Sequence, residues 1–161
     1  MFQNPKHVEK YSEYRPNYPS SLFQSFVDYQ RLCCPAPRSR LAVDVGCGSG
    51  QSTFGLCRHF DSVVGVDKNE TQLQLARDRA AGNDEHKSVL WSCCLAEKLD
   101  FLENDSVDLV TIGQALHWVE ADAFYLASTR ILRPGGVVVA YGYGMPEVEN
   151  RSAQDVLLNV C

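Results

Sequence analysis

Short apolar runs alternate with amphipathic stretches along most of this chain. Runs of four to seven residues rich in valine, leucine and isoleucine predict buried strands, whereas apolar residues spaced three or four positions apart predict one face of a helix. These patterns predict five strands, at 41–45, 62–66, 88–94, 106–112 and 137–143.

The segments between the strands have helical spacing. Asn69 is expected to cap a helix, because its short side chain can accept hydrogen bonds from the first free backbone N–H groups. The sequence Arg-Pro-Gly-Gly at 133–136 is expected to end the last helix before the final strand begins. The predicted helices cover residues 20–34, 51–60, 69–81 and 121–132.

Strands that alternate with helices form a parallel sheet through right-handed crossovers. The predicted fold class is therefore α/β: a Rossmann-like, mostly parallel sheet with helices on both faces. We expect a single domain over 1–161, with an N-terminal lid segment and helix at 1–40, a ligand-binding core at 41–143 and a tail at 144–161. Ligands of such sheets bind beyond the carboxyl ends of the strands.

A glycine-rich turn follows the first predicted strand, with Gly46, Gly48 and Gly50 in the spacing G-x-G-x-G rather than the dinucleotide spacing G-x-G-x-x-G. Asp44 precedes it, and its carboxylate would repel a pyrophosphate but attract a ligand with an ammonium and a sulfonium group. Asp67 ends the second strand, where an acid suits two ribose hydroxyls. Together these residues predict S-adenosylmethionine as cofactor; the alternative for the glycines alone is a tight turn without a ligand.

Composition narrows the function further. The net charge is −5 and no basic block is present, so nucleic acid is not an expected partner. No apolar run is long enough to span a membrane, and no secretory signal begins the chain, so we expect a cytoplasmic protein. The seven cysteines then read as reduced thiols, and no C-x-x-C pair predicts a metal site. Cys93 and Cys94 are expected to end a buried strand.

Six segments of the chain also form a recognisable set. They are YSEYRPNYP (11–19), VDVGCGSG (43–50), VVGVDKN (63–69), AEKLDF (96–101), SVDLVTIGQALHW (106–118) and ILRPGG (131–136). Together they resemble the class I S-adenosylmethionine-dependent methyltransferases, of the small-molecule type similar to trans-aconitate methyltransferase. The resemblance covers roughly residues 8–143.

The resemblance implies roles for individual residues. Asp44 would lie near the cofactor's amino group, Asp67 would hold the ribose, and the backbone of Ala96 would bind the adenine edge. Many relatives place an acid before this alanine, but Leu95 stands here, so adenine recognition is left to backbone and packing. The implied cofactor-binding residues are Asp44, Gly46, Cys47, Gly48, Gly50, Asp67, Lys68, Ala96 and Gln114.

Methyl transfer from a sulfonium is an in-line displacement that depends on positioning and needs no metal. We expect a small-molecule acceptor; a carboxylate acceptor would need no base, whereas a hydroxyl or an amine would benefit from one. His117, after the fourth strand, is the candidate base, although it could instead pack on Trp118 and shape the pocket. Arg15 is the candidate partner for an acceptor carboxylate, or else part of a strap that covers the sheet.

The resembled family has seven strands, whereas five are predicted here, for which the resemblance implies the order 3-2-1-4-5. The strand at 137–143 would then have an unpaired edge, through which the chain could self-associate. Two alternatives to an active methyltransferase follow. One is a catalytically inactive remnant that binds the cofactor or a partner. The other is a nicotinamide-dependent oxidoreductase, which the glycine spacing and Asp44 argue against.

Overall fold

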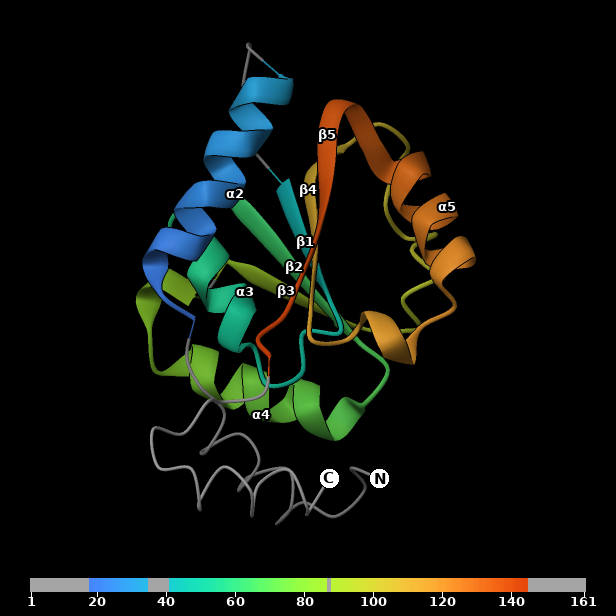
Figure 1. The fold of residues 1–161 in the computed structure, drawn as a ribbon. Coiled ribbons are helices and arrows are strands. Elements are labelled where there is room, and N and C mark those ends of the chain that lie inside the picture. The colour runs from blue at the N-terminus through green and yellow to red at the C-terminus, as the bar shows by residue number, and fades with distance from the viewer. Residues whose placement is uncertain (1–17, 35–40, 87, 145–161) are drawn as a thin grey trace, which may run out of the picture.

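The computed structural model describes residues 18–34, 41–86 and 88–144. Five parallel strands form one sheet in the order β3-β2-β1-β4-β5 (Figure 1), which confirms the predicted order. The strands are β1 (Leu41–Val45), β2 (Ser62–Asp67), β3 (Val89–Cys93), β4 (Val107–Gly113) and β5 (Leu132–Tyr141).

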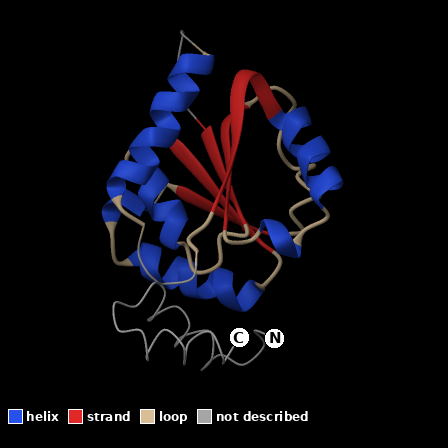
Figure 2. Ribbon diagram, in the orientation of Figure 1, coloured by secondary structure: helices blue, strands red, loops and turns tan. Residues whose placement is uncertain are grey.

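Helices cover both faces of the sheet, as Figure 2 shows. Helices α2 and α3 pack on one face and α5 packs on the other, while α4 contacts β2 and β3. The helices are α2 (Ser20–Cys33), α3 (Gln51–Leu56), α4 (Glu70–Ala81) and α5 (Ala121–Ile131), with short 3-10 turns η1 (Asp84–His86) and η2 (Leu116–Trp118).

Two apolar clusters hold the layers together. Phe23, Phe26 and Leu56 fill the space between the sheet and helices α2 and α3, and Phe124 and Ile131 fill the space below α5. All seven residues of β4 are buried, because this strand lies between two others with helices on both faces. Such a strand reads as a continuous apolar run, which is why the sequence pattern located it.

Helix α4 begins as predicted. The Oδ1 atom of Asn69 accepts hydrogen bonds from the backbone N–H groups of Thr71 and Gln72, at 3.0 and 3.4 Å. The predicted apolar face of this helix is also confirmed, since Leu73 and Ala76 are fully buried.

The predicted boundary at Arg-Pro-Gly-Gly is wrong. Strand β5 starts at Leu132, directly after α5, and the four residues lie within it. Leu132 pairs with Val107 and Val137 pairs with Leu109, so the strand bulges opposite Asp108. Gly135 allows the bulge with a φ of +82°, a left-handed conformation that glycine adopts without steric cost.

Two other predictions need correction. Helix α3 ends at Leu56 rather than at residue 60, and the chain continues in turns. Cys93 does not end a buried strand: β3 is an edge strand, and Cys93 is exposed. Within the described ranges β5 is the other edge, paired with β4 alone. The proposed lid residues 11–17 lie outside the described residues, as does most of the predicted tail, 145–161.

Candidate functional site

A cavity of about 640 Å³ opens beyond the carboxyl ends of β1, β2 and β4. Its volume is typical of sites for small molecules and cofactors, which span roughly 300–1,000 Å³. Strands β2 and β4 flank β1, so the segments that follow all three reach the same end of the sheet. Six of the residues predicted to bind the cofactor line this cavity: Gly46, Gly48, Asp67, Lys68, Ala96 and Gln114.

The glycine turn forms the wall of the cavity nearest β1. Gly46, Gly48 and Gly50 have φ angles of +66°, +54° and +85°, so each adopts a conformation that other residues rarely take. A Cβ atom on Gly46 would lie 2.6 Å from the Cβ of Ala115. Glycine is therefore required there for the turn after β1 to pack against the segment after β4.

Three backbone N–H groups of this turn donate within the protein. The N–H of Gly48 donates to Oδ2 of Asp67 at 2.9 Å. The N–H groups of Cys47 and Gly50 donate to the carbonyls of Val66 and Cys47, each at 3.0 Å. A phosphate-binding turn aims such groups at its ligand. In this turn the same groups donate to protein acceptors, and the carboxylate of Asp67 lies against the second glycine, Gly48.

Asp67 contacts the backbone on one side and faces the cavity on the other. Its second oxygen, Oδ1, accepts a hydrogen bond from the N–H of Asn69 at 2.8 Å. Each carboxylate oxygen can accept more than one hydrogen bond, so Asp67 retains acceptor capacity toward the cavity that it lines. Its backbone-bound carboxylate is suited to hydroxyl donors and unsuited to an anion.

Asp44 does not line the cavity, unlike Asp67. Its carboxylate is 1% exposed and lies among buried groups. The hydroxyls of Thr53 and Thr111 donate to its two oxygens at 2.7 and 2.8 Å. Of the other two predicted turn residues, Gly50 is buried behind the cavity wall, and so is Cys47.

The pKa of the Cys47 thiol reflects the negative charge around the glycine turn. Burial raises its pKa well above the ordinary value, and the negative charges of Asp44 and Asp67 raise it further. These carboxylates disfavour a thiolate at the turn for the same reason that they would disfavour a phosphate there. They would favour a cationic ligand.

The opposite wall comes from the segment after β4. Gln114 has a φ of +56°, an uncommon conformation for a residue with a side chain. Its backbone N–H donates to the carbonyl of Tyr141 at 2.9 Å, and its side-chain Nε2 donates to the carbonyl of Tyr143 at 3.0 Å. The end of β5 thus fixes Gln114 where it lines the cavity.

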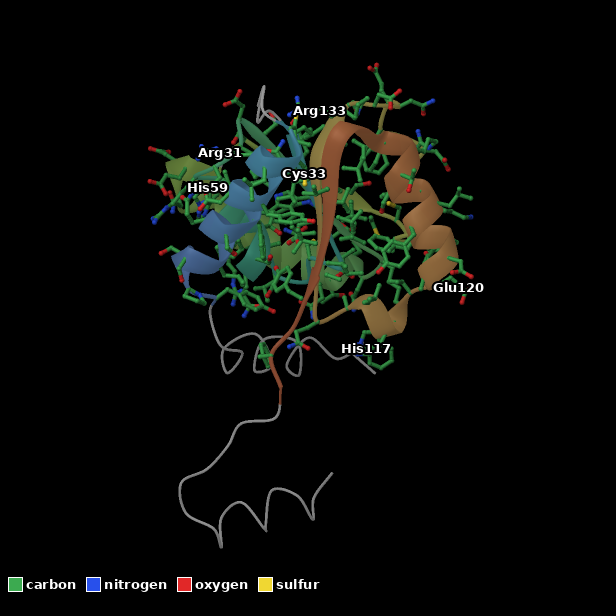
Figure 3. The ribbon with its side chains drawn as sticks, turned by 45° about the horizontal axis from the view of Figure 1, so that its top comes forward. Arg31, Cys33, His59, His117, Glu120 and Arg133 are labelled. Atoms are coloured by element: carbon green, nitrogen blue, oxygen red, sulfur yellow. The ribbon has the colours of Figure 1, made fainter. Side chains whose placement is uncertain are left out.

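The two predicted catalytic residues have different outcomes. His117 is exposed and does not line the cavity, and Figure 3 shows it at the periphery of the molecule. Its ring centroid lies 4.9 Å from that of Trp118. Arg15 lies outside the described residues.

Trp118 is a cavity residue that the sequence patterns did not predict. Trp118 lines the cavity although 62% of it remains exposed, and Leu95, 44% exposed, lines it from the segment after β3. The signal in the sequence was the position of Trp118 in the short segment between β4 and α5, at the end of the sheet where ligands bind.

In residues 18–34, 41–86 and 88–144, no three His, Cys, Asp or Glu side chains are grouped so that they could hold a metal ion. Across the same ranges, no helix has both the length and the apolar character needed to cross a membrane.

Comparison with known proteins shows that this chain is similar to methyltransferases. Residues 43–140 match the family model of the methyltransferase domain. A Dictyostelium discoideum protein provisionally named a methyltransferase is 34% identical over 149 residues, which cover 92% of this chain and 52% of that protein. The methyltransferase pgmE of Aspergillus terreus is 30% identical over 82% of this chain and 40% of its own length. The chain thus spans about half the length of these relatives.

Solved structures agree with this assignment. A structure from Anaeromyxobacter dehalogenans, provisionally named a type II methyltransferase, has a TM-score of 0.72 and 34% identity, covering 91% of this chain and 55% of that one. The geranyl diphosphate C-methyltransferase of Streptomyces coelicolor A3(2), solved with S-adenosylhomocysteine, shares the fold with a TM-score of 0.64 at 21% identity, covering 87% and 51% of the two chains. The chain therefore belongs to the class I S-adenosylmethionine-dependent methyltransferase family.

Proposed function

We propose that this chain binds S-adenosylmethionine in the cavity and transfers its methyl group to a small molecule. One observation carries the proposal: the carboxylate of Asp67 accepts the N–H of Gly48, so the glycine turn presents an acceptor where a phosphate-binding turn presents donors. A cofactor that offers hydroxyls and positive charge suits this arrangement. The same observation disfavours a nicotinamide dinucleotide, whose pyrophosphate needs the donors.

The cavity residues then have distinct roles. Asp67 would accept the ribose hydroxyls, Lys68 would flank the adenine, and the backbone of Ala96 would bind its edge. Leu95 and Trp118 would cover the ring with apolar surface, which replaces the acid that many relatives carry at position 95. Their exposure in the cavity supports this role, because both offer apolar area that a bound ring would remove from water.

The glycine turn and the segment after β4 would hold the methionine part. Gly46 and Gly48 permit close approach of the ligand to the backbone, with Cys47 and Gly50 shaping the turn from behind. Asp44 would act through the turn: its buried carboxylate supplies negative charge without touching the ligand. Gln114 would lie at the boundary between cofactor and acceptor.

When bound, S-adenosylmethionine supplies a methyl group on a positively charged sulfur. The chain's own part is to orient the acceptor in line and to exclude water. A carboxylate acceptor needs no base; for a hydroxyl or an amine, His117 is the proposed base, since it lies beside the cavity residue Trp118. Arg15 is the proposed partner for an acceptor carboxylate.

The remaining expectations concern the whole protein. We propose a cytoplasmic, trans-aconitate-methyltransferase-like enzyme of small-molecule type, without a nucleic-acid partner, consistent with its net charge of −5. We also propose that β5 provides an edge for self-association. Binding of the cofactor without turnover is the alternative function.

The test is calorimetric titration with S-adenosylhomocysteine, which requires no acceptor. We expect saturable binding by the wild type and at least a tenfold loss in Asp67→Ala. Asp78→Ala is the matched control, because Asp78 is exposed on α4 and accepts only from Gln74 among the bonds found for it. A nicotinamide dinucleotide should not compete. Equal binding by Asp67→Ala and the wild type would contradict the proposed site.

A further inference from the structure

Helix α4 supports the glycine turn through Ser49, a turn residue that does not line the cavity. Nη1 of Arg79, in the last turn of α4, donates to Oγ of Ser49 at 3.0 Å and to the Ser49 carbonyl at 3.3 Å. Ser49 is 3% exposed and lies between Gly48 and Gly50. In Figure 1 the turn after β1 descends to α4 at the bottom of the view.

The turn needs such support because of its composition. Glycine loses more conformational freedom on folding than any other residue, and this turn has three glycines in five positions, 46–50. Asp67 holds Gly48 through its backbone N–H, whereas Arg79 holds the next residue through its carbonyl and hydroxyl. Consecutive residues are thus fixed from β2 and from α4.

We infer that Arg79 is a positioning residue for cofactor binding. By holding Ser49 it keeps Gly46 and Gly48 in the conformation that lines the cavity, although Arg79 itself does not line it. This inference rests on the proposed function of the cavity.

The chemistry of the contact requires a long side chain with a charged donor. A single guanidinium nitrogen carries two hydrogens and so serves both acceptors of Ser49. A charged donor also makes stronger hydrogen bonds than a neutral one. Lysine keeps the charge but not the planar donor group, so Arg79→Lys should restore part of the effect lost in Arg79→Met.

The chain offers a matched control two residues away. Arg77 lies on the same helix and pairs with Glu70 at the surface, where its side chain is 35% exposed. Arg77→Met therefore makes the same substitution in α4 and removes one charge, without touching the glycine turn. Because its partner Glu70 lines the cavity, this variant serves as the control for the order of the turn and not for binding. Exposed pairs of this kind contribute little to stability.

The first measurement is hydrogen–deuterium exchange without a ligand. We expect the backbone N–H groups of the turn, at 46–50, to exchange faster in Arg79→Met than in the wild type or in Arg77→Met. Exchange in the β4 peptide, which packs in the centre of the sheet, should remain the same in all three. Unchanged exchange in the turn would overturn the inference, whatever the ligand of the cavity is.

The second measurement is titration of the same variants with S-adenosylhomocysteine. Arg79→Met should bind about tenfold more weakly than the wild type, and Arg79→Lys should fall between them. The control for binding is Arg58→Met, because Arg58 pairs with Glu85 at the surface and neither residue lines the cavity. This variant should change the affinity by less than about twofold. Ser49→Ala should weaken binding less in Arg79→Met than in the wild type, because the Oγ contact to Arg79 is already lost there. Additive losses would point to general destabilisation and overturn the inference.

The two proposals can fail separately. If the wild type binds no S-adenosylhomocysteine, the proposed function of the cavity is wrong, and so is a cofactor role for Arg79. If the wild type binds and Arg79→Met binds equally well, only the role of Arg79 is wrong.

Discussion

Cys47 is the turn residue whose chemistry is most easily measured. Its thiol is 6% exposed, and burial, followed by the charges of Asp44 and Asp67, raises its pKa well above the ordinary value. Because the thiolate is the form that reacts, we expect iodoacetamide at pH 8 to leave Cys47 unmodified in the folded protein. Peptide mass spectrometry would measure the labelling.

Two controls make that result interpretable. Cys33 is exposed and should be labelled in the same sample. In concentrated urea Cys47 should be labelled as fully as Cys33, since unfolding removes the burial. Rapid labelling of Cys47 in the folded protein would contradict the buried, negatively charged environment.

The sequence predicted the charge of the site from Asp44 and Asp67, but not which of the two faces the cavity. Asp44 and Asp67 are both acids at or near the ends of predicted strands, and their identity as acids was enough to predict a site for a cation rather than a phosphate. The structure separates them, since Asp67 lines the cavity and Asp44 is buried. The difference depends on Thr53 and Thr111, which reach Asp44 from 9 and 67 positions away. Contacts over such separations have no periodic signal.

At the scale of elements, the contribution of the N-terminal cap of α4 to stability can be measured with single substitutions. Asn69 caps this helix through its side-chain oxygen. Replacing it with alanine leaves the first N–H groups without that acceptor, so Asn69→Ala should lower the free energy of unfolding by about 1 kcal/mol in urea denaturation. Asn69→Ser retains an acceptor and should cost only a few tenths of that. Equal losses in the two variants would place the effect outside the cap.

The elements themselves were largely predictable, and the exceptions have a common cause. In the part of the chain that the structure describes, apolar periodicity located the five strands and four helices, because each element buries one face or both. The Arg-Pro-Gly-Gly segment was misplaced because local turn chemistry favours a break there, whereas the ion pair between Arg133 and the buried Asp108 joins this segment to β4. A tertiary contact overrode the local preference.

For the whole molecule, the lowered pKa values of two histidines, His59 and His86, make the free energy of unfolding depend on pH. Burial lowers the pKa of His86, whose ring stacks on Phe54 at 4.2 Å between centroids. Burial also lowers the pKa of His59, with smaller contributions in the same direction from Arg31 and Arg58; Figure 3 shows Arg31 and His59 on the same side of the molecule. Glu85 and Asp28 oppose these shifts in part.

The sign of the effect follows from proton uptake. Below about pH 6.5, the unfolded chain binds protons at these histidines more readily than the folded protein does. The free energy of unfolding should therefore fall as pH decreases from 7.5 to 5.5, and urea denaturation at both values would measure it. A variant with His59→Gln and His86→Gln should show a smaller difference between the two pH values. An undiminished difference would assign the dependence to other groups.

The parallel sheet was predictable at this scale because alternating elements permit few topologies, and the resemblance to the methyltransferases supplied the strand order. The cavity was predictable in position, since ligands of such sheets bind where the strands end. Its wall was predicted only in part. Trp118 and Leu95 contribute apolar surface from separate segments, and which side chains of a segment face a cavity depends on packing that no single stretch of sequence encodes.

The internally bonded glycine turn has a consequence for the time course of binding. The N–H groups of Cys47, Gly48 and Gly50 have partners before any ligand arrives, so the turn is ordered during folding. Cofactor association would then be a single bimolecular step. In stopped-flow experiments the observed rate would rise linearly with cofactor concentration and show no plateau from a slower rearrangement of the turn.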